Sequence, residues 1–139
     1  PIIGPPWATI SAIDLNKGEL VWQTVHGETD DAVKNHPALK GVTIPRTGRT
    51  GRVGVLTTKT LVMSGDGGMA THPNGQRSGM FRAYDKATGK ELGAVPIPGP
   101  QTGSPMTYMH EGKQYIVVAV SGQGAAAELI GLALPDAPK

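Results

Sequence analysis

The chain contains one stretch twice, at residues 9–22 and again at residues 80–93. An offset of 71 residues aligns an alanine, an aspartate and a glycine of the two copies: Ala12 with Ala83, Asp14 with Asp85 and Gly18 with Gly89. Each copy predicts a strand, a tight turn and a second strand, because aspartate accepts backbone N–H bonds in a turn and glycine adopts a positive φ without a steric clash. A hairpin that recurs within one chain is typical of repeat and propeller architectures.

The composition agrees with many short strands joined by turns. The 139 residues include 20 glycines and 12 prolines, a content unusual for a helical protein. The net charge of +2, from 13 basic and 11 acidic residues, is too small to indicate a nucleic-acid partner. The absence of cysteine excludes disulfides and thiolate metal sites. No stretch approaches the roughly 20 apolar residues of a membrane span, and because the first residue is not Met we expect the natural start to lie earlier.

Alternating apolar residues and turn residues predict nine strands. They are residues 7–14 and 19–25, residues 52–57 and 60–65, two strands in the second copy, and residues 104–109, 113–121 and 129–134. Residues 115–120 are apolar on both faces, which predicts a strand buried on both sides. Residues 26–51 form a long loop with a short helical turn near residues 31–35, and long loops are often functional.

These strands group as two, four and three, which predicts an all-β fold made of propeller blades. Residues 1–25 would be the outer hairpin of one blade, residues 52–95 a complete four-stranded antiparallel blade, and residues 104–134 three strands of a closing blade. The total is about two and a quarter blades of a β-propeller. Such a fragment alone would leave large apolar sheet faces exposed.

The repeated stretch resembles a known family. Residues 12–22 resemble the tryptophan-docking motif of quinoprotein dehydrogenase propellers, and residues 81–92 resemble its next copy. Residues 103–118 are similar to the last-blade signature of that family, and residues 132–135 look like the end of a membrane-type glucose dehydrogenase. The resemblance covers nearly the whole chain. It implies an eight-bladed propeller that is periplasmic or secreted and oxidises a sugar or alcohol with pyrroloquinoline quinone (PQQ) and Ca²⁺.

The chain departs from the family pattern at several points. Gly93 stands where the motif has tryptophan, so one docking contact is lost, and residues 51–54 replace a Gly-Gly-Pro segment. The metal ligands and the catalytic aspartate of the family lie before the region that this chain covers. The resemblance therefore implies no catalytic residue and no metal ligand here, with Ca²⁺ bound mainly by residues outside the chain.

The candidate cofactor-binding residues lie where the chain enters the innermost strand of the complete blade, an end that opens on the central funnel of a propeller. They are Arg46, Arg49, Thr50 and Arg52. The fork of a guanidinium pairs bidentately with carboxylate, which suits a tricarboxylated quinone. The alternative is that these are solvated loop charges. On the substrate side of the funnel we expect Gln123 and His72, which lies in the polar, Gly-rich loop 66–79.

Other motifs indicate structure rather than chemistry. Residues 122–127 match the G-x-G-x-x-A pattern of dinucleotide-binding proteins, but too little chain follows for a helix and a second strand, so a loop is expected there. The four histidines have no metal-ligand spacing and are expected in surface loops. Trp7 and Trp22 are expected to pack between blades.

Three functions follow from these observations. The first is the C-terminal segment of a quinone-dependent dehydrogenase, catalytically incomplete by itself. The second is a non-enzymatic propeller scaffold that binds proteins, and the third is a small stand-alone β-domain. For the first two we expect residues 129–134 to present an unpaired edge, with the remaining blades supplied by another chain or segment.

Overall fold

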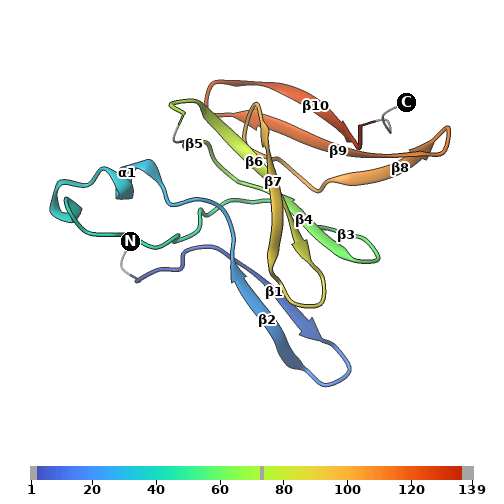
Figure 1. Ribbon diagram of the computed structural model, residues 1–139, viewed down its shortest axis with the longest axis horizontal. Coiled ribbons are helices and arrows are strands. Elements are labelled where there is room, and N and C mark those ends of the chain that lie inside the picture. The colour runs from blue at the N-terminus through green and yellow to red at the C-terminus, as the bar shows by residue number, and fades with distance from the viewer. Residues whose placement is uncertain (1–2, 73, 136–139) are drawn as a thin grey trace.

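The computed structural model describes residues 3–72 and 74–135, and nearly all of its regular secondary structure consists of strands (Figure 1). The strands are β1 (Thr9–Asp14), β2 (Glu19–Val25), β3 (Leu56–Thr57), β4 (Leu61–Gly65), β5 (Ala70–Thr71), β6 (Arg77–Asp85), β7 (Glu91–Ile97), β8 (Met106–His110), β9 (Lys113–Gly122) and β10 (Ala125–Ala133). The only helical elements in these residues are α1 (Asp31–Lys34) and a 3-10 turn, η1 (Pro37–Leu39). Neither has the length or apolar character needed to cross a membrane.

The strands form three antiparallel sheets that follow one another along the chain. The first sheet pairs β1 with β2, the middle sheet has the order β3-β4-β6 with β5 and β7 also paired to β6, and the last sheet has the order β10-β9-β8. The middle sheet lies between the first hairpin, drawn blue in Figure 1, and the last sheet, drawn orange to red. The first and last sheets therefore contact the middle sheet from opposite sides.

The two copies of the repeated stretch have the same hairpin geometry. Ala12 pairs with Trp22 and Ala83 pairs with Gly93, and the register of both ladders shifts immediately after the alanine. In both turns the aspartate carboxylate accepts two backbone N–H groups, and the glycine has a φ of 71° in the first copy and 72° in the second. The predicted hairpins and their turn chemistry are confirmed.

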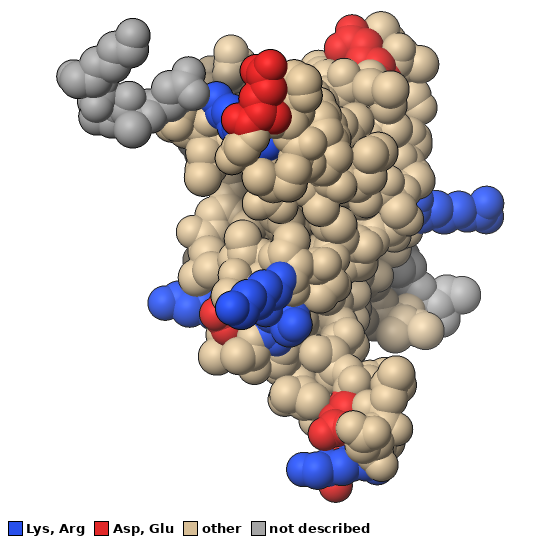
Figure 2. Space-filling model, turned by 90° about the vertical axis from the view of Figure 1, so that its right-hand side faces the viewer, with Lys and Arg blue, Asp and Glu red and all other residues tan. Residues whose placement is uncertain are grey.

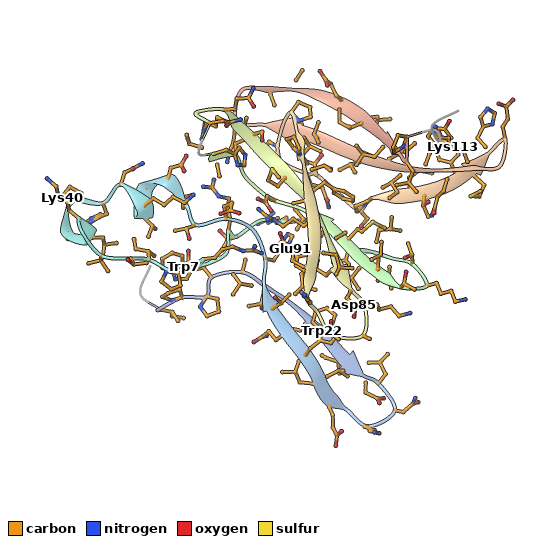
Figure 3. The ribbon with its side chains drawn as sticks, in the orientation of Figure 1. Trp7, Trp22, Lys40, Asp85, Glu91 and Lys113 are labelled. Carbon is orange, nitrogen blue, oxygen red and sulfur yellow. The ribbon has the colours of Figure 1, made fainter. Side chains whose placement is uncertain are left out.

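Trp22 joins the first sheet to the middle sheet. Its indole Nε1–H donates a hydrogen bond of 2.9 Å to the backbone carbonyl of Lys86, in the turn between β6 and β7. Its ring lies over Gly89 of the same turn, where a Cβ atom would come within 2.5 Å of the ring. Figure 3 shows Trp22 beside Asp85 at this turn. The packing role predicted for Trp22 is therefore confirmed.

Two apolar clusters fill the spaces between the sheets. Ile10, Val62 and Tyr84 pack between the first and middle sheets, with Trp22 at their edge. The second cluster packs between the middle and last sheets and consists of Met63, Phe81, Ile97, Val118 and Val120. The middle sheet is thus buried on both faces, because adjacent residues of a strand point to opposite sides.

The last sheet is buried on one face only. Val118 and Val120 of β9 are buried, whereas Val117 and Ala119, which alternate with them along the strand, are only partly buried. The prediction of a strand buried on both sides is therefore wrong for β9, because no further sheet covers its outer face within the described residues. The edge prediction is confirmed, since β10 pairs only with β9 in this part of the chain and the side chain of Leu129 is 75% exposed.

Two predicted segments differ from the structure. The expected strand 52–57 is reduced to β3 and a single parallel bridge between Val53 and Gly103. The Gly54 carbonyl instead accepts hydrogen bonds from the side chains of Ser64 and Gln101. The expected loop 122–127 is a two-residue turn, because Gln123 and Gly124 have φ angles of 53° and 86° that suit a tight hairpin, so β10 begins at Ala125.

The equivalent turn glycines provide a matched test of the Trp22 contact. Gly18 and Gly89 have nearly equal φ angles, but a Cβ atom meets nothing within 4 Å at Gly18 and meets the Trp22 ring at Gly89. Gly18→Ala should lower the free energy of unfolding by about 1 kcal/mol, the cost of a positive φ. Gly89→Ala should cost about 1–3 kcal/mol more, because the ring must move. Equal losses in urea unfolding would contradict the docking contact.

Candidate functional site

The long loop 26–51 is fixed to the middle sheet by one buried guanidinium. Arg82 on β6 is 3% exposed and binds Asp66 with two bonds, Nε to Oδ1 at 2.8 Å and Nη2 to Oδ2 at 3.1 Å. Its Nη1 donates to Glu91 of β7 at 3.0 Å, and its Nη2 donates to Glu28 of the loop at 2.9 Å. Because these carboxylates lie after β4, on β7 and in the loop, one side chain holds three segments together.

Arg46 extends this group from the far end of the loop. Its Nη2 donates to Glu91 at 2.7 Å and to the Val25 carbonyl at 2.9 Å. We call the five residues the Arg82 cluster: Glu28, Arg46, Asp66, Arg82 and Glu91. Burial alone would lower the pKa of Arg82, but the surrounding carboxylates raise it above its usual value. Burial alone would raise the pKa of Glu91, but the two arginines outweigh it and hold that pKa below its usual value.

The start of the loop is held by a buried histidine. The imidazole of His26 lies 3.0 Å from the Gly65 carbonyl through Nε2 and 2.9 Å from the Tyr84 hydroxyl through Nδ1. A carbonyl only accepts, so Nε2–H donates to Gly65 and Nδ1 accepts from Tyr84. Burial lowers the pKa of His26, which favours this neutral form. The prediction of a surface-loop histidine is therefore wrong at position 26, because the start of the loop packs against Gly65 and Tyr84 of the middle sheet and buries the imidazole.

Arg49 lies at the end of the loop, and it is 8% exposed. Its Nη1 donates a 2.6 Å hydrogen bond to the Met69 carbonyl, while the Met69 N–H donates to Oε1 of Gln123 at 2.9 Å. The backbone of Met69 therefore brings together two predicted site residues that are 74 positions apart. Gly68 lies against both side chains, because a Cβ there would approach Arg49 within 2.7 Å and Gln123 within 3.4 Å.

The guanidinium of Arg49 has unused donors. Nη2 lies 3.3 Å from Oδ2 of Asp30, close enough for an ion pair, but neither Nη2 nor Nε makes a hydrogen bond within the described residues. A buried guanidinium N–H without an acceptor carries a desolvation cost of about 1–3 kcal/mol. The donor set thus fits an additional anionic or carbonyl acceptor, such as a carboxylate of a quinone cofactor.

The other predicted site residues lie apart from this pair. Thr50 and Arg52 are exposed on the segment that follows Arg49. His72 lies in the β5–β6 hairpin, where its Nε2 is 2.8 Å from the Ser78 hydroxyl. Arg46 is engaged in the Arg82 cluster. No group of three metal-ligating side chains comes together in residues 3–72 and 74–135.

Close backbone contacts fix the path of this segment. Gly48 has a φ of 76°, and a Cβ there would lie 2.5 Å from the Ala8 carbonyl. Gly51 faces Gly67 so closely that a Cβ would lie 2.5 Å from the Gly67 Cα. Only glycine therefore permits the chain to carry Arg49 and Thr50 between the first hairpin and the end of β4.

Sequence reasoning missed the role of Gln101. Its Oε1 accepts from the Gly65 N–H, and its Nε2 donates to the carbonyls of Gly54 and Gly103 at 2.9 Å each. Its own N–H donates to the Asp66 carbonyl. One buried amide thus links β4, the shortened inner strand and the segment before β8, and no local pattern in residues 98–104 marks it.

Charge gives no indication of a polyanionic macromolecular partner. The face of the molecule in Figure 2 is mostly uncharged and carries a few acidic and basic side chains, several of which lie against one another. This distribution agrees with the small net charge of +2. The candidate site therefore depends on one buried guanidinium and not on a basic surface.

The sequence of the chain is similar to one known protein family and to several of its members. Residues 1–116 match the sequence profile of the family described as PQQ glucose/ethanol/alcohol dehydrogenase, beta-propeller domain. A probable quinate dehydrogenase (quinone) of Xanthomonas campestris pv. juglandis is 32% identical over 147 residues, which cover 99% of this chain and 17% of that protein. Quinoprotein glucose dehydrogenase A of Acinetobacter calcoaceticus is 32% identical over 141 residues, which cover 98% of this chain and 16% of that protein.

A third relative is the glycerol dehydrogenase large subunit of Gluconobacter thailandicus. It is 32% identical over 145 residues, which cover 97% of this chain and 18% of that protein. The chain thus spans about one sixth of the length of the curated relatives that it matches. No solved structure matches the chain at a significant level.

Protonation of His26 should make stability depend on pH. The folded pKa is lowered from about 6.5, so as the pH falls below 6.5 the unfolded chain binds the proton first and the free energy of unfolding decreases. The loss should approach roughly 1 kcal/mol per pH unit until the folded pKa is reached. His26→Gln should remove this slope in urea unfolding between pH 7 and 5.5, whereas the control His110→Gln, at an exposed turn, should keep it. An unchanged slope in His26→Gln would rule out this residue as the source.

Proposed function

This chain belongs to the PQQ glucose/ethanol/alcohol dehydrogenase β-propeller family, and we propose that it is the C-terminal segment of a quinone-dependent dehydrogenase that oxidises a sugar or alcohol. The family match over residues 1–116 carries this proposal, with relatives that align along 97–99% of the chain. Their names span quinate, glucose and glycerol dehydrogenases. We therefore propose no narrower substrate class than a sugar or another small molecule with an oxidisable alcohol group.

We assign the three sheets to three successive blades. Residues 1–25 supply the outer hairpin of one blade, residues 52–95 a complete blade, and residues 104–134 three strands of the closing blade. The antiparallel order β3-β4-β6-β7 of the middle sheet and the docking of Trp22 onto the next hairpin support this division. The remaining blades come from another chain or segment, which agrees with the open edge of β10.

Arg49 is the strongest candidate for a contact with the cofactor. Its side chain is buried and held on one side by the Met69 carbonyl. Within residues 3–72 and 74–135 its Nε and Nη2 make no hydrogen bond, although Nη2 lies 3.3 Å from Asp30 Oδ2. PQQ would supply an acceptor for the two electrons removed from the substrate alcohol, while the protein supplies orientation. We propose that Arg49 donates to an anionic oxygen of the quinone. We also propose that Thr50 and Arg52, on the same segment, line the cofactor site.

Gln123 and the Arg82 cluster have supporting roles in this proposal. Gln123 accepts from Met69 and has its amide nitrogen near Gly68. On this basis we propose that Gln123 lies on the substrate side of Arg49. Arg46 acts through Glu91 by fixing the loop that carries Arg49. His72 lies in a neighbouring hairpin and is proposed to border the substrate entrance. Any Ca²⁺ would be bound by residues outside this chain, and the protein would be periplasmic or secreted, as the family resemblance implies.

The Arg49 assignment can be tested in the dehydrogenase that contains this chain. Arg49→Gln should weaken PQQ binding at least tenfold in equilibrium dialysis, because a charge-assisted hydrogen bond contributes about 1.5–3 kcal/mol. Dye-linked oxidation of glucose or ethanol should fall in parallel at low PQQ. The matched control is Arg77→Gln, an exposed arginine at the start of β6.

A conservative variant separates binding from folding. Arg49→Lys keeps the positive charge and a donor for the Met69 carbonyl but lacks the guanidinium fork. It should fold normally, shown by an unchanged unfolding midpoint, and still bind PQQ more weakly than the parent. Normal PQQ affinity in both variants would exclude Arg49 from the cofactor site, and a parent enzyme that never binds PQQ would refute the dehydrogenase proposal itself.

The open edge predicts the behaviour of the chain on its own. Residues 1–139 should self-associate in sedimentation velocity, because β10 exposes unpaired N–H and C=O groups and the last sheet exposes an uncovered face. Adding the remaining blades of the parent protein should return a single stable species. A monomer with slowly exchanging amides along both edges of β10 would instead favour a stand-alone β-domain.

A further inference from the structure

Two consecutive aspartates at the start of α1 connect the loop to the surroundings of Arg49. Asp30, the N-cap of α1, places its Oδ2 atom 3.3 Å from Nη2 of Arg49. Asp31, the next residue, has its carboxylate on Thr71 of β5 instead. Figure 1 shows α1 beside β5. The first turn of α1 is therefore tied both to the guanidinium and to the short strand that runs close to it.

Asp31 binds both donors of Thr71. The Thr71 hydroxyl donates to Oδ2 at 2.9 Å, and the backbone N–H lies 3.3 Å from Oδ1 and 3.2 Å from Oδ2. Among the described strands β5 pairs only with β6, so this N–H lies on the open edge of the sheet. Burial alone would raise the pKa of Asp31, but the Thr71 bonds outweigh it and hold that pKa below its usual value. The contact is therefore charge-assisted, and such bonds are about twice as strong as neutral ones.

Thr71 lies close in sequence to the peptide unit that holds Arg49. Nη1 of Arg49 donates to the Met69 carbonyl at 2.6 Å, and the Met69 N–H donates to Gln123. Only the buried Ala70 separates Met69 from Thr71. Because the peptide units between them are planar, a shift of Thr71 changes the direction of the Met69 carbonyl.

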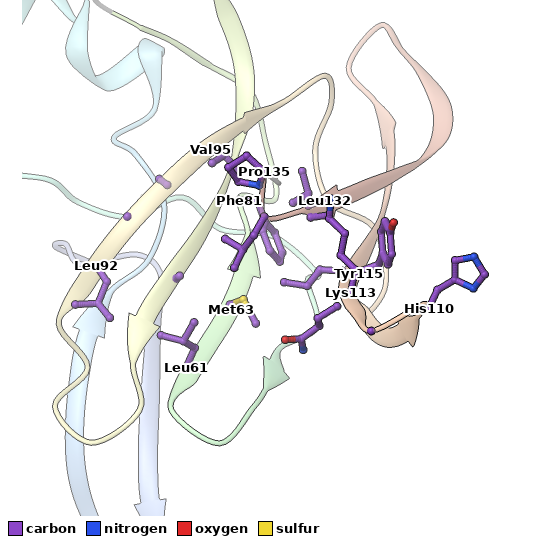
Figure 4. Close-up of a pocket in the computed structure, with 18 of the residues that line it drawn as sticks. Leu61, Met63, Phe81, Leu92, Val95, His110, Lys113, Tyr115, Leu132 and Pro135 are labelled. Carbon is purple, nitrogen blue, oxygen red and sulfur yellow. The ribbon is translucent and has the colours of Figure 1, made fainter. Parts of the chain in front are cut away.

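The contacts of Arg49 are separate from the cleft between the middle and last sheets. Figure 4 shows this cleft, with Phe81 and Val95 on one side and Leu132 on the other. The cleft opens beside the free edge of β10, and neither Arg49 nor Asp31 lines it. The position of Arg49 is thus set by contacts that the loop and the β5 segment supply themselves.

We propose that Asp31 is a positioning residue of the Arg49 site. Its carboxylate fixes Thr71, which fixes the direction of the Met69 carbonyl. That carbonyl holds the guanidinium, whose Nε and Nη2 are left for an anionic acceptor in the part of the chain that the structure describes. The consequence for PQQ rests on the proposed function, whereas the position of the Arg49 side chain can be measured without PQQ.

The first test uses the dehydrogenase that contains this chain, before PQQ is added. Phenylglyoxal modifies accessible guanidinium groups, and peptide mass spectrometry gives the rate at each arginine. Arg49 is 8% exposed and should react slowly, whereas the exposed Arg52 should react fast. Asp31→Ala should raise the rate at Arg49 at least about fivefold, which corresponds to the loss of about 1 kcal/mol. Arg52 should keep its rate, and the buried Arg82 should stay slow, which excludes general unfolding.

A double-mutant cycle shows whether Asp31 acts through Thr71. Thr71→Val removes the hydroxyl but keeps the backbone N–H, so it should raise the Arg49 rate less than Asp31→Ala does. Adding Thr71→Val to Asp31→Ala should cause no further increase, because the shared contact is already lost. Thr71→Ser keeps both donors and should behave like the parent. These exposed Thr71 variants also cover the case in which Asp31→Ala does not fold.

The matched control is Asp14→Ala. The Asp14 carboxylate also accepts two backbone N–H groups, but it does so in the turn between β1 and β2. Its removal should leave the modification rate of Arg49 unchanged.

Equilibrium dialysis then measures the effect on the cofactor. Asp31→Ala should weaken PQQ binding at least about threefold and leave the Michaelis constant for glucose or ethanol unchanged at saturating PQQ. An unchanged modification rate of Arg49 in Asp31→Ala, or additive effects of Asp31→Ala and Thr71→Val, would overturn the positioning role whether or not the parent binds PQQ. Faster modification with unchanged PQQ affinity would support the positioning role and count against the proposed contact between Arg49 and PQQ.

Discussion

Burial of the Arg82 guanidinium constrains much of this structure. A buried charge must be surrounded by opposite charge and hydrogen-bond acceptors, and Arg82 finds them in Asp66, Glu91 and Glu28. These residues lie after β4, on β7 and in the long loop, so the loop can adopt its path only when the middle sheet is formed. The neighbouring contact of His26 with Tyr84 and Gly65 secures the start of the same loop. The position of Arg49 depends on this arrangement, because its backbone N–H donates to the His26 carbonyl and its side chain contacts Met69 and Asp30.

The packing between sheets depends on a second interaction, the docking of a tryptophan, which occurs at only one of the two junctions between the described sheets. Trp22 docks onto the next hairpin through a hydrogen bond and a contact that only glycine at position 89 allows. The equivalent contact is missing at Gly93, yet the middle and last sheets still associate through Phe81, Ile97 and Val118. Apolar burial together with the hydrogen bonds of Gln101 therefore joins these two sheets without a docking tryptophan.

Much of the local structure could be predicted from the sequence because it depends on neighbours along the chain. The repeated Asp-x-x-x-Gly turns, the hairpins at residues 9–25 and 77–97 and the helical turn at residues 31–34 follow from turn chemistry and alternation. The family and the all-β propeller class are also confirmed, since residues 1–116 match the family. The errors concern long-range effects. Side-chain hydrogen bonds to Gly54 replace most of an expected strand, and β9 is half-exposed because its outer face has no covering sheet in the described residues.

The sequence by itself determined the elements, the repeat and the family, because each of these is encoded in residues a few positions apart or in a motif of fixed spacing. It also identified Arg49 and Gln123 as site candidates, but not that one peptide unit, Met69, connects them. Only the tertiary structure decided which arginine is buried with free donors, which is part of an ion-pair cluster and which is exposed. It also decided that His26 is buried and that its pKa is therefore lowered. The physical reason is that burial, charge pairing and desolvation depend on segments brought together from distant parts of the chain, and no local pattern records which segments will meet.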